Sequence, residues 1–167
     1  MTKSEKNLKE AFAGESQANR KYLAFAQKAE KDGFPQVAKL FRAAAEAETV
    51  HAHNHLRVMG GIKSTLENLK SAIEGEHYEF NKMYPDFLKD AIKEGNKDAE
   101  RTFNYANEVE KIHHILYEEA LKSVEAGKDL AKNEIYVCPV CGYTHEGAPP
   151  DKCPVCGTPK EKFKKID

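Results

Sequence analysis

The sequence predicts a four-helix bundle followed by a small, β-rich module that holds a metal ion. Three observations support this prediction. Up to about Gly127, Ala, Glu, Lys and Leu dominate and the apolar residues recur with a helical period. Glycine-containing breaks divide this part into four long stretches. All four cysteines lie in the last thirty residues, as two Cys-x-x-Cys pairs among Pro, Gly and short β-prone segments.

The four helices are expected at residues 4–32, 35–59, 64–94 and 97–126. Thr2-x-x-Glu5 and Ser64-x-x-Glu67 are capping boxes that open the first and third helices. Pro85 is expected to kink the third helix rather than end it, because the apolar periodicity continues to Ile92. Four amphipathic helices with short connections indicate a bundle.

Length and charge restrict the classes of function. A chain of 167 residues suffices for one ordinary domain and a metal-stapled module, which we expect to divide into residues 1–130 and 131–167. A net charge of −1 gives no electrostatic reason to bind nucleic acid or an anionic membrane. No segment resembles a membrane span or a signal peptide, so the free thiols predict a cytoplasmic protein.

Each predicted apolar stripe carries a glutamate at about its mid-length, and two of these glutamates begin a Glu-x-x-His pattern. Adding 62 to Glu48 and His51 gives Glu110 and His113, and adding 61 to Glu15 gives Glu76. The helical part of the chain therefore reads as two helical hairpins in tandem. Each hairpin supplies one Glu and one Glu-x-x-His.

Buried carboxylates are strongly disfavoured unless they are paired or bound to a metal. Four glutamates and two histidines at one level of a bundle core are explained together by two metal ions, and this donor set suits iron or manganese. The alternative is that the patterns arise by chance in a chain that is 32% charged. Glu79, one turn beyond Glu76, is a seventh candidate ligand. Tyr22 and Tyr84 are either hydrogen-bond donors to these carboxylates or ordinary core tyrosines.

The cysteine pairs predict a second metal site. Cys138, Cys141, Cys153 and Cys156 would present four thiolates, which zinc and iron both accept. The alternative is two disulfides, which the absence of any secretory feature disfavours.

These motifs together resemble the rubrerythrin family, in which a ferritin-like di-iron bundle precedes a rubredoxin-like domain. The bundle motifs are Phe12-Ala-Gly-Glu15, Glu48-Thr-Val-His51, Gly75-Glu76-His-Tyr-Glu79 and Glu110-Lys-Ile-His113. The knuckles are Cys138-Pro-Val-Cys141-Gly and Cys153-Pro-Val-Cys156-Gly. The resemblance covers essentially the whole chain and lacks none of the family's metal ligands.

The resemblance implies two irons in the bundle, with Glu79 and His51 exchanging at one of them, and one iron in the cysteine site, where zinc can substitute. It further implies reduction of hydrogen peroxide to water and protection against oxidative stress. Electrons would come from a nicotinamide cofactor through rubredoxin or another separate reductase, since no Gly-x-Gly-x-x-Gly motif is present. A head-to-tail homodimer or a higher homo-oligomer is implied too. The alternatives are a ferroxidase that handles iron and a helical interaction module with a structural zinc ribbon.

Overall fold

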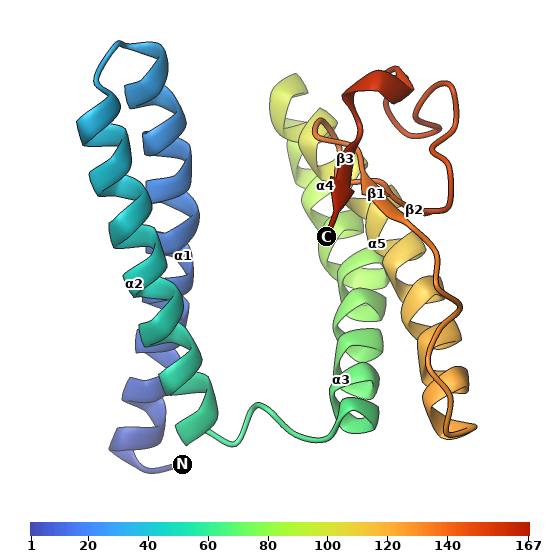
Figure 1. The fold of residues 1–167 in the computed structure, drawn as a ribbon, viewed down its shortest axis with the longest axis horizontal. Coiled ribbons are helices and arrows are strands. Elements are labelled where there is room, and N and C mark those ends of the chain that lie inside the picture. The colour runs from blue at the N-terminus through green and yellow to red at the C-terminus, as the bar shows by residue number, and fades with distance from the viewer. The chain divides into compact units, whose positions relative to one another are not determined.

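The computed structural model describes all 167 residues as two compact units, Met1–Lys63 and Ser64–Asp167. The first unit is a helical hairpin and the second combines a helical hairpin with a small sheet (Figure 1). Four helical stretches followed by a cysteine-bearing β-rich segment confirm the predicted fold class. The predicted division at residue 130 concerns sequence domains and stays a prediction. No helix has the length and apolar character needed to cross a membrane.

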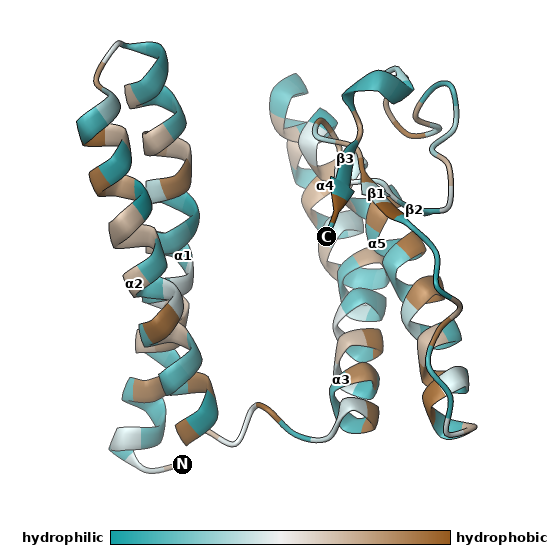
Figure 2. Cartoon of the chain, viewed as in Figure 1, coloured by the Kyte–Doolittle hydropathy of each residue, from teal (hydrophilic) through white to brown (hydrophobic).

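The first unit consists of α1 (Lys3–Lys31) and α2 (Pro35–Val58). The Thr2 capping box is present, and Gly33 takes a positive φ of 84° in the turn before Pro35 opens α2. Ala26, Ala29 and Ala38 form the buried seam, where small side chains let the two helices approach closely. Apolar and polar residues alternate along each helix as expected for amphipathic helices (Figure 2).

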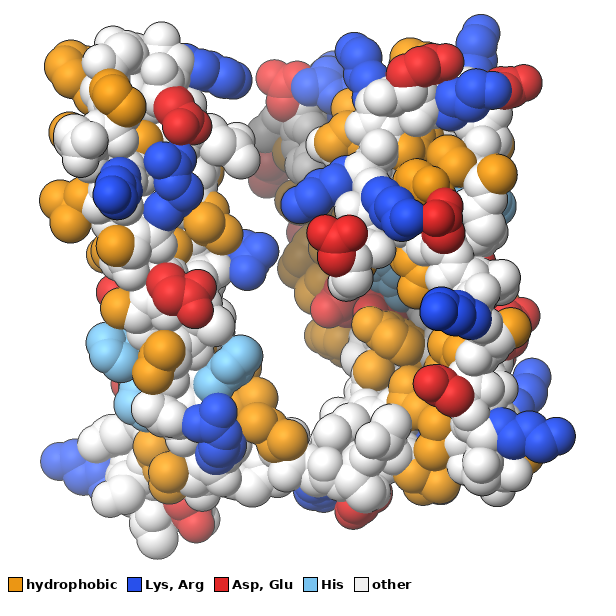
Figure 3. All heavy atoms as spheres, in the orientation of Figure 1, with side chains coloured by type: hydrophobic (Ala, Val, Ile, Leu, Met, Phe, Trp, Pro, Cys, Tyr) orange, Lys and Arg blue, Asp and Glu red, His pale blue; other side chains and the backbone are white.

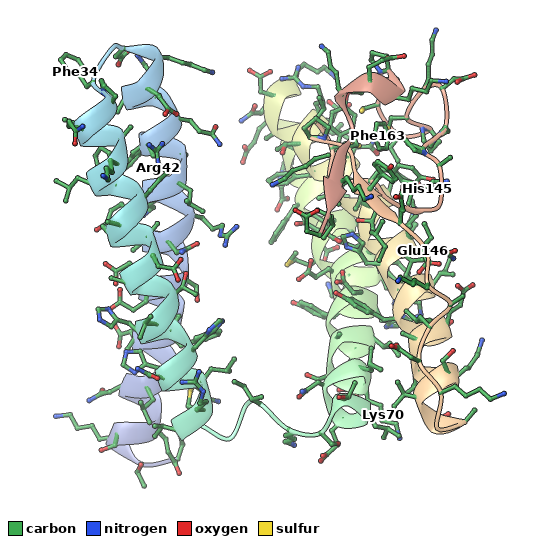
Figure 4. The ribbon with its side chains drawn as sticks, in the orientation of Figure 1. Phe34, Arg42, Lys70, His145, Glu146 and Phe163 are labelled. Atoms are coloured by element: carbon green, nitrogen blue, oxygen red, sulfur yellow. The ribbon has the colours of Figure 1, made fainter.

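Few side chains other than the alanine seam are buried in this hairpin. Leu40 is 69% exposed and Val50 is 52% exposed, and Phe34 projects from the turn (Figure 4). A two-helix hairpin has only one inner face, so it cannot enclose the remaining apolar side chains. The unit therefore has the character of half a bundle.

The helices of the second unit are α3 (Thr65–Tyr78), a π-helical turn (Glu79–Met83), α4 (Tyr84–Glu94) and α5 (Lys97–Glu125). The Ser64 capping box is present, and Gly95 adopts the left-handed conformation between α4 and α5. These bounds agree with the predicted helices to within one residue.

The π-helical turn accounts for how the chain passes Pro85. The Tyr84 amide donates to the Glu79 carbonyl, five residues back, so the helix takes in one extra residue without ending. Pro85 has no amide hydrogen and stands in the first turn of α4, where none is needed. The expectation that helical structure continues through Pro85 is confirmed, and the irregularity lies in the turn that precedes the proline.

The small module has β1 (Ile135–Val137), β2 (Thr144–Glu146), a 3-10 turn (Lys160–Lys162) and β3 (Lys164–Ile166), paired antiparallel in the order β2-β1-β3. Tyr143, His145 and Phe163 form an aromatic cluster on it (Figure 4). Strand β2 also packs against α5 of the same unit.

Candidate metal centres

The first candidate centre lies within the α1–α2 hairpin. One oxygen each from Glu15 and Glu48 and one ring nitrogen of His51 lie within 4.8 Å of one another. His51 is one turn beyond Glu48, and its Nδ1 is 2.8 Å from the Glu48 carboxylate. Its side chain is 54% exposed, and histidines gather over the lower part of this hairpin in Figure 3. The cluster therefore lies at a helix surface, with one side open.

The second candidate centre lies within the helices of the second unit. Glu76 comes from α3, and Glu110 and His113 come from α5, again with their donor atoms within 4.8 Å. His113 Nδ1 is 2.7 Å from a Glu110 oxygen and 3.8 Å from a Glu76 oxygen. This is the same donor set as in the first hairpin, so the structure repeats the tandem pattern that the sequence predicted.

The second cluster holds its carboxylates in an unfavourable environment. Partial burial, and then repulsion from Glu110, raise the pKa of Glu76 to about 7, against a smaller lowering by His113. A hydrogen bond with Glu110 raises the pKa of His113 despite the opposing effect of burial. Crowded acidic oxygens facing an imidazole nitrogen are the donor set that a divalent metal ion requires, so these residues fit the iron that the sequence implied.

We expect the metal-free protein to lose stability as the pH rises from about 5 to about 8. Glu76 and His113 both have pKa values above their ordinary ones, so the folded state binds protons more tightly than the unfolded state. Their contribution is present at low pH and disappears as the pH passes the raised values. Saturation with Co²⁺ should reverse the slope, because the metal binds the deprotonated ligands. Thermal unfolding at several pH values measures both slopes.

The Glu76→Gln variant is the matched control, since it removes the titrating group and keeps its shape. Its metal-free protein should show a flatter pH dependence of Tm than the wild type. An unchanged pH dependence in this variant would mean that Glu76 is not the group responsible.

The remaining predicted site residues have distinct surroundings. Glu79 opens the π-helical turn outside the three-residue cluster, and burial followed by repulsion from Glu110 raises its pKa. Burial, and then the charge of Glu79, raise the pKa of Tyr84. Tyr22 packs its ring 6.2 Å from that of Phe41. Tyr84 therefore belongs to the acidic environment, whereas the contacts of Tyr22 are those of a core tyrosine.

Two further residues near the clusters escaped the sequence analysis as site residues. Asn19 is buried one turn beyond Glu15, and its amide donates to the Ala45 carbonyl and the Thr49 hydroxyl across the hairpin. The sequence feature that could have identified Asn19 is a polar amide on an otherwise apolar helix stripe. Thr144 of β2 lies 2.9 Å from His113, and no local pattern in the sequence indicates this contact.

The cysteine module brings its four sulfurs together within 4.8 Å. The Cys138–Cys156 and Cys141–Cys153 separations are 3.6 and 3.4 Å, far longer than a sulfur–sulfur bond of about 2 Å, so the disulfide alternative is wrong. Both knuckles close in the same way. The Gly142 amide donates to the Cys138 carbonyl, and the Gly157 amide donates to the Cys153 carbonyl.

The knuckle backbone favours a thiolate at one position. Burial by itself would raise the pKa of Cys138, but hydrogen bonds from the Cys141 and Val140 amides outweigh it and lower this pKa to about 7. Burial raises the pKa of Cys141, which faces the other sulfurs. A cage of four sulfurs with amides already aimed at it fits a tetrahedral thiolate-bound metal ion.

Two family models match the chain. The rubrerythrin model matches residues 6–121, and the model of the rubrerythrin rubredoxin-like domain matches residues 136–164. The two matches cover the helices with both Glu/His clusters and the module with the four cysteines.

Individual relatives align over nearly the full chain. Rubrerythrin-2 of Clostridium acetobutylicum is 39% identical over 170 residues, covering 93% of this chain and 92% of the relative. Nigerythrin of Nitratidesulfovibrio vulgaris is 37% identical, covering 94% of this chain and 83% of the relative.

Solved structures of nigerythrin have the same fold. The mixed-valence structure matches with a TM-score of 0.58 at 35% identity, covering 99% of this chain and 88% of that chain. The fully reduced, all-ferrous structure matches with a TM-score of 0.59 at 34% identity and the same coverage. Together with the Glu/His clusters and the four-sulfur cage, these matches show that the chain belongs to the rubrerythrin family, as an oxidoreductase with a candidate di-iron site and a rubredoxin-like domain.

Proposed function

We propose that this protein is a non-haem peroxidase that reduces hydrogen peroxide to water with electrons relayed through its four-cysteine iron site. The observation that carries this proposal is the docking of the cysteine module on α5, the helix that supplies Glu110 and His113. A peroxidase site must be reduced again after every turnover, and a neighbouring electron-transfer module can deliver those electrons. A ferroxidase needs no such module, because its ferrous substrate brings the electrons.

The proposed di-iron ligands are the six clustered residues and Glu79, which would alternate with His51 as a ligand of one iron. When bound, the two irons would supply the two electrons that peroxide reduction requires and would act as Lewis acids on the peroxide oxygens. Cys138, Cys141, Cys153 and Cys156 would hold a further iron, which would supply one-electron transfer to the bundle site.

The two protons that the reaction consumes would come from solvent. Glu76 would be deprotonated as a metal ligand, whereas Tyr84 keeps its hydroxyl proton because burial and nearby carboxylates raise its pKa. Tyr84 thus serves as a neutral hydrogen-bond donor toward the site. We propose the same role for Tyr22 only from its place in the sequence, on the stripe of Glu15, since in the hairpin its ring packs against Phe41. Glu79 would accept or release a proton when it leaves or joins the metal site.

We further propose that two copies of the chain are needed to complete the bundle. Ferritin-like bundles contain one long crossover connection, which runs the length of a helix. Here α2 has 24 residues, about 36 Å, whereas only Met59–Ser64 connect α2 to α3 and can span at most about 25 Å. The α1–α2 hairpin of one copy would therefore join α3–α5 of the second copy, and each dimer would contain two di-iron sites.

The electron donor would be a separate protein, either rubredoxin or another reductase that draws on a nicotinamide cofactor. We place the reaction in the cytoplasm, where reducing conditions keep the four thiols free for iron. A role in protection against oxidative stress follows from removal of peroxide.

The test is anaerobic mixing of fully reduced, iron-loaded protein with one equivalent of hydrogen peroxide, followed by its visible absorption. We expect the thiolate-bound iron to be reoxidised much faster than by dissolved oxygen. Reoxidation at the same rate by oxygen, or a cysteine site that stays reduced while the bundle irons oxidise, would overturn the proposal in favour of a ferroxidase.

A further inference from the structure

The second metal cluster and the cysteine module meet at one hydrogen bond between side chains. Nε2 of His113 lies 2.9 Å from Oγ1 of Thr144. The opposite ring nitrogen, Nδ1, is the atom that faces Glu110 and Glu76. His113 is thus held from one side by the bundle carboxylates and from the other by a residue of β2.

The protons of this arrangement can be assigned from its contacts. A threonine hydroxyl has one hydrogen to donate, and Thr144 directs it to the Gly142 carbonyl at 3.2 Å. Towards His113 the hydroxyl oxygen can then only accept, so His113 must donate from Nε2. In the metal-free protein Nδ1, 2.7 Å from the Glu110 carboxylate, donates as well, because a carboxylate only accepts. A metal ion bound at Nδ1 would displace that hydrogen and leave the one on Nε2.

We propose that Thr144 is the positioning residue that prepares His113 as a metal ligand, an inference that rests on the proposed di-iron site. Thr144 selects the imidazole tautomer with hydrogen on Nε2 and holds the ring so that Nδ1 points at the carboxylates. Hydrogen bonds of this kind to the far nitrogen of a ligating histidine set both its tautomer and its basicity.

The position of Thr144 depends on the fold of the cysteine knuckle. Thr144 follows Cys141 by three residues, after the turn at Gly142, which has a φ of 86°. Its backbone is then held by pairing with Val137 in the β2–β1 ladder. The residues that form the sulfur cage therefore also place the hydroxyl, and His113 is oriented only when the module is folded and docked on α5.

The test compares Thr144→Val with the wild type in protein loaded with Zn²⁺, a diamagnetic metal ion, using ¹⁵N NMR of the histidine side chains. We expect the wild-type His113 to have its hydrogen on Nε2 and the Val variant to populate both tautomers. In a separate titration with Co²⁺ alone, we expect affinity at the bundle to fall by about 10- to 100-fold. Thr144→Ser, which keeps the hydroxyl, should restore both properties.

Thr102→Val on the exposed face of α5 is the matched control and should change neither property. Metal binding at the four cysteines shows that each variant has a folded module. An unchanged tautomer and an unchanged Co²⁺ affinity in Thr144→Val would overturn the role of Thr144 and leave the peroxidase proposal standing. A shifted tautomer in a protein whose wild type does not reduce peroxide would support the positioning role and reject the proposed function.

Discussion

Two inactive variants of this protein should form an active mixed dimer if the hairpins are exchanged between copies. One variant carries Glu48→Gln and His51→Ala, and the other carries Glu110→Gln and His113→Ala. In an exchanged dimer the two intact halves meet in one bundle and the two altered halves meet in the other. We expect a doubly tagged, purified mixed dimer to regain about half of the bundle iron and half of the peroxidase activity of the wild type.

The homodimers of either variant are the matched controls, because every bundle in them contains one altered half. A mixed dimer without bundle iron would show that each chain closes its own bundle and would reject the exchange. A second variant tests the physical reason. Insertion of about 20 flexible residues between Gly60 and Gly61 lengthens the connection enough to return along a helix, so it should shift the protein toward monomers.

Substitution of one metal-binding cysteine, Cys153→Ser, should have the other large effect. The module has three strands of three residues each and only a small apolar core, so its stability depends on the metal. Structural thiolate sites contribute about 10 kcal/mol or more to folding. We expect loss of the metal, unfolding of residues 135–166, and a fall of about 100-fold or more in turnover with an external reductase.

The bundle irons of this variant should still oxidise once with peroxide when they are reduced chemically beforehand. Amide hydrogen exchange reports whether the module unfolds, and visible absorption reports its iron. Val140→Ala changes an exposed residue between the cysteines of the other knuckle and should leave both measurements unchanged. Normal steady-state turnover in Cys153→Ser would remove the cysteine site from the electron route.

Local signals in the sequence predicted the helices to within one residue. Capping boxes at Thr2 and Ser64 and the glycine at position 95 act through contacts within one or two turns, so they could be recognised without the fold. The π-helical turn at Glu79 was not predicted. It adds only one residue to one helical turn. The spacing of apolar residues before and after the turn still fits a regular α-helix, so the sequence pattern did not reveal it.

The donor residues of the metal centres could also be predicted, because a helix places residues three or four apart on one face. Glu110 and His113 meet for this reason alone, and the repeated spacing in Glu48 and His51 identified the equivalent pair. The close spacing of the cysteines within the two knuckles predicted the four-sulfur site. Their roles as ligands remain predictions that the mixed-dimer and cysteine experiments test.

The sequence by itself thus determined the helices and the candidate donor residues of the three clusters, since each depends on spacing along the chain. The raised pKa of Glu76 and the contact of Thr144 with His113 were decided by tertiary structure alone. Burial and repulsion depend on which carboxylates the packing of α3 on α5 brings together. The Thr144 contact joins residues 31 positions apart, and it exists because the cysteine module docks on one particular face of α5.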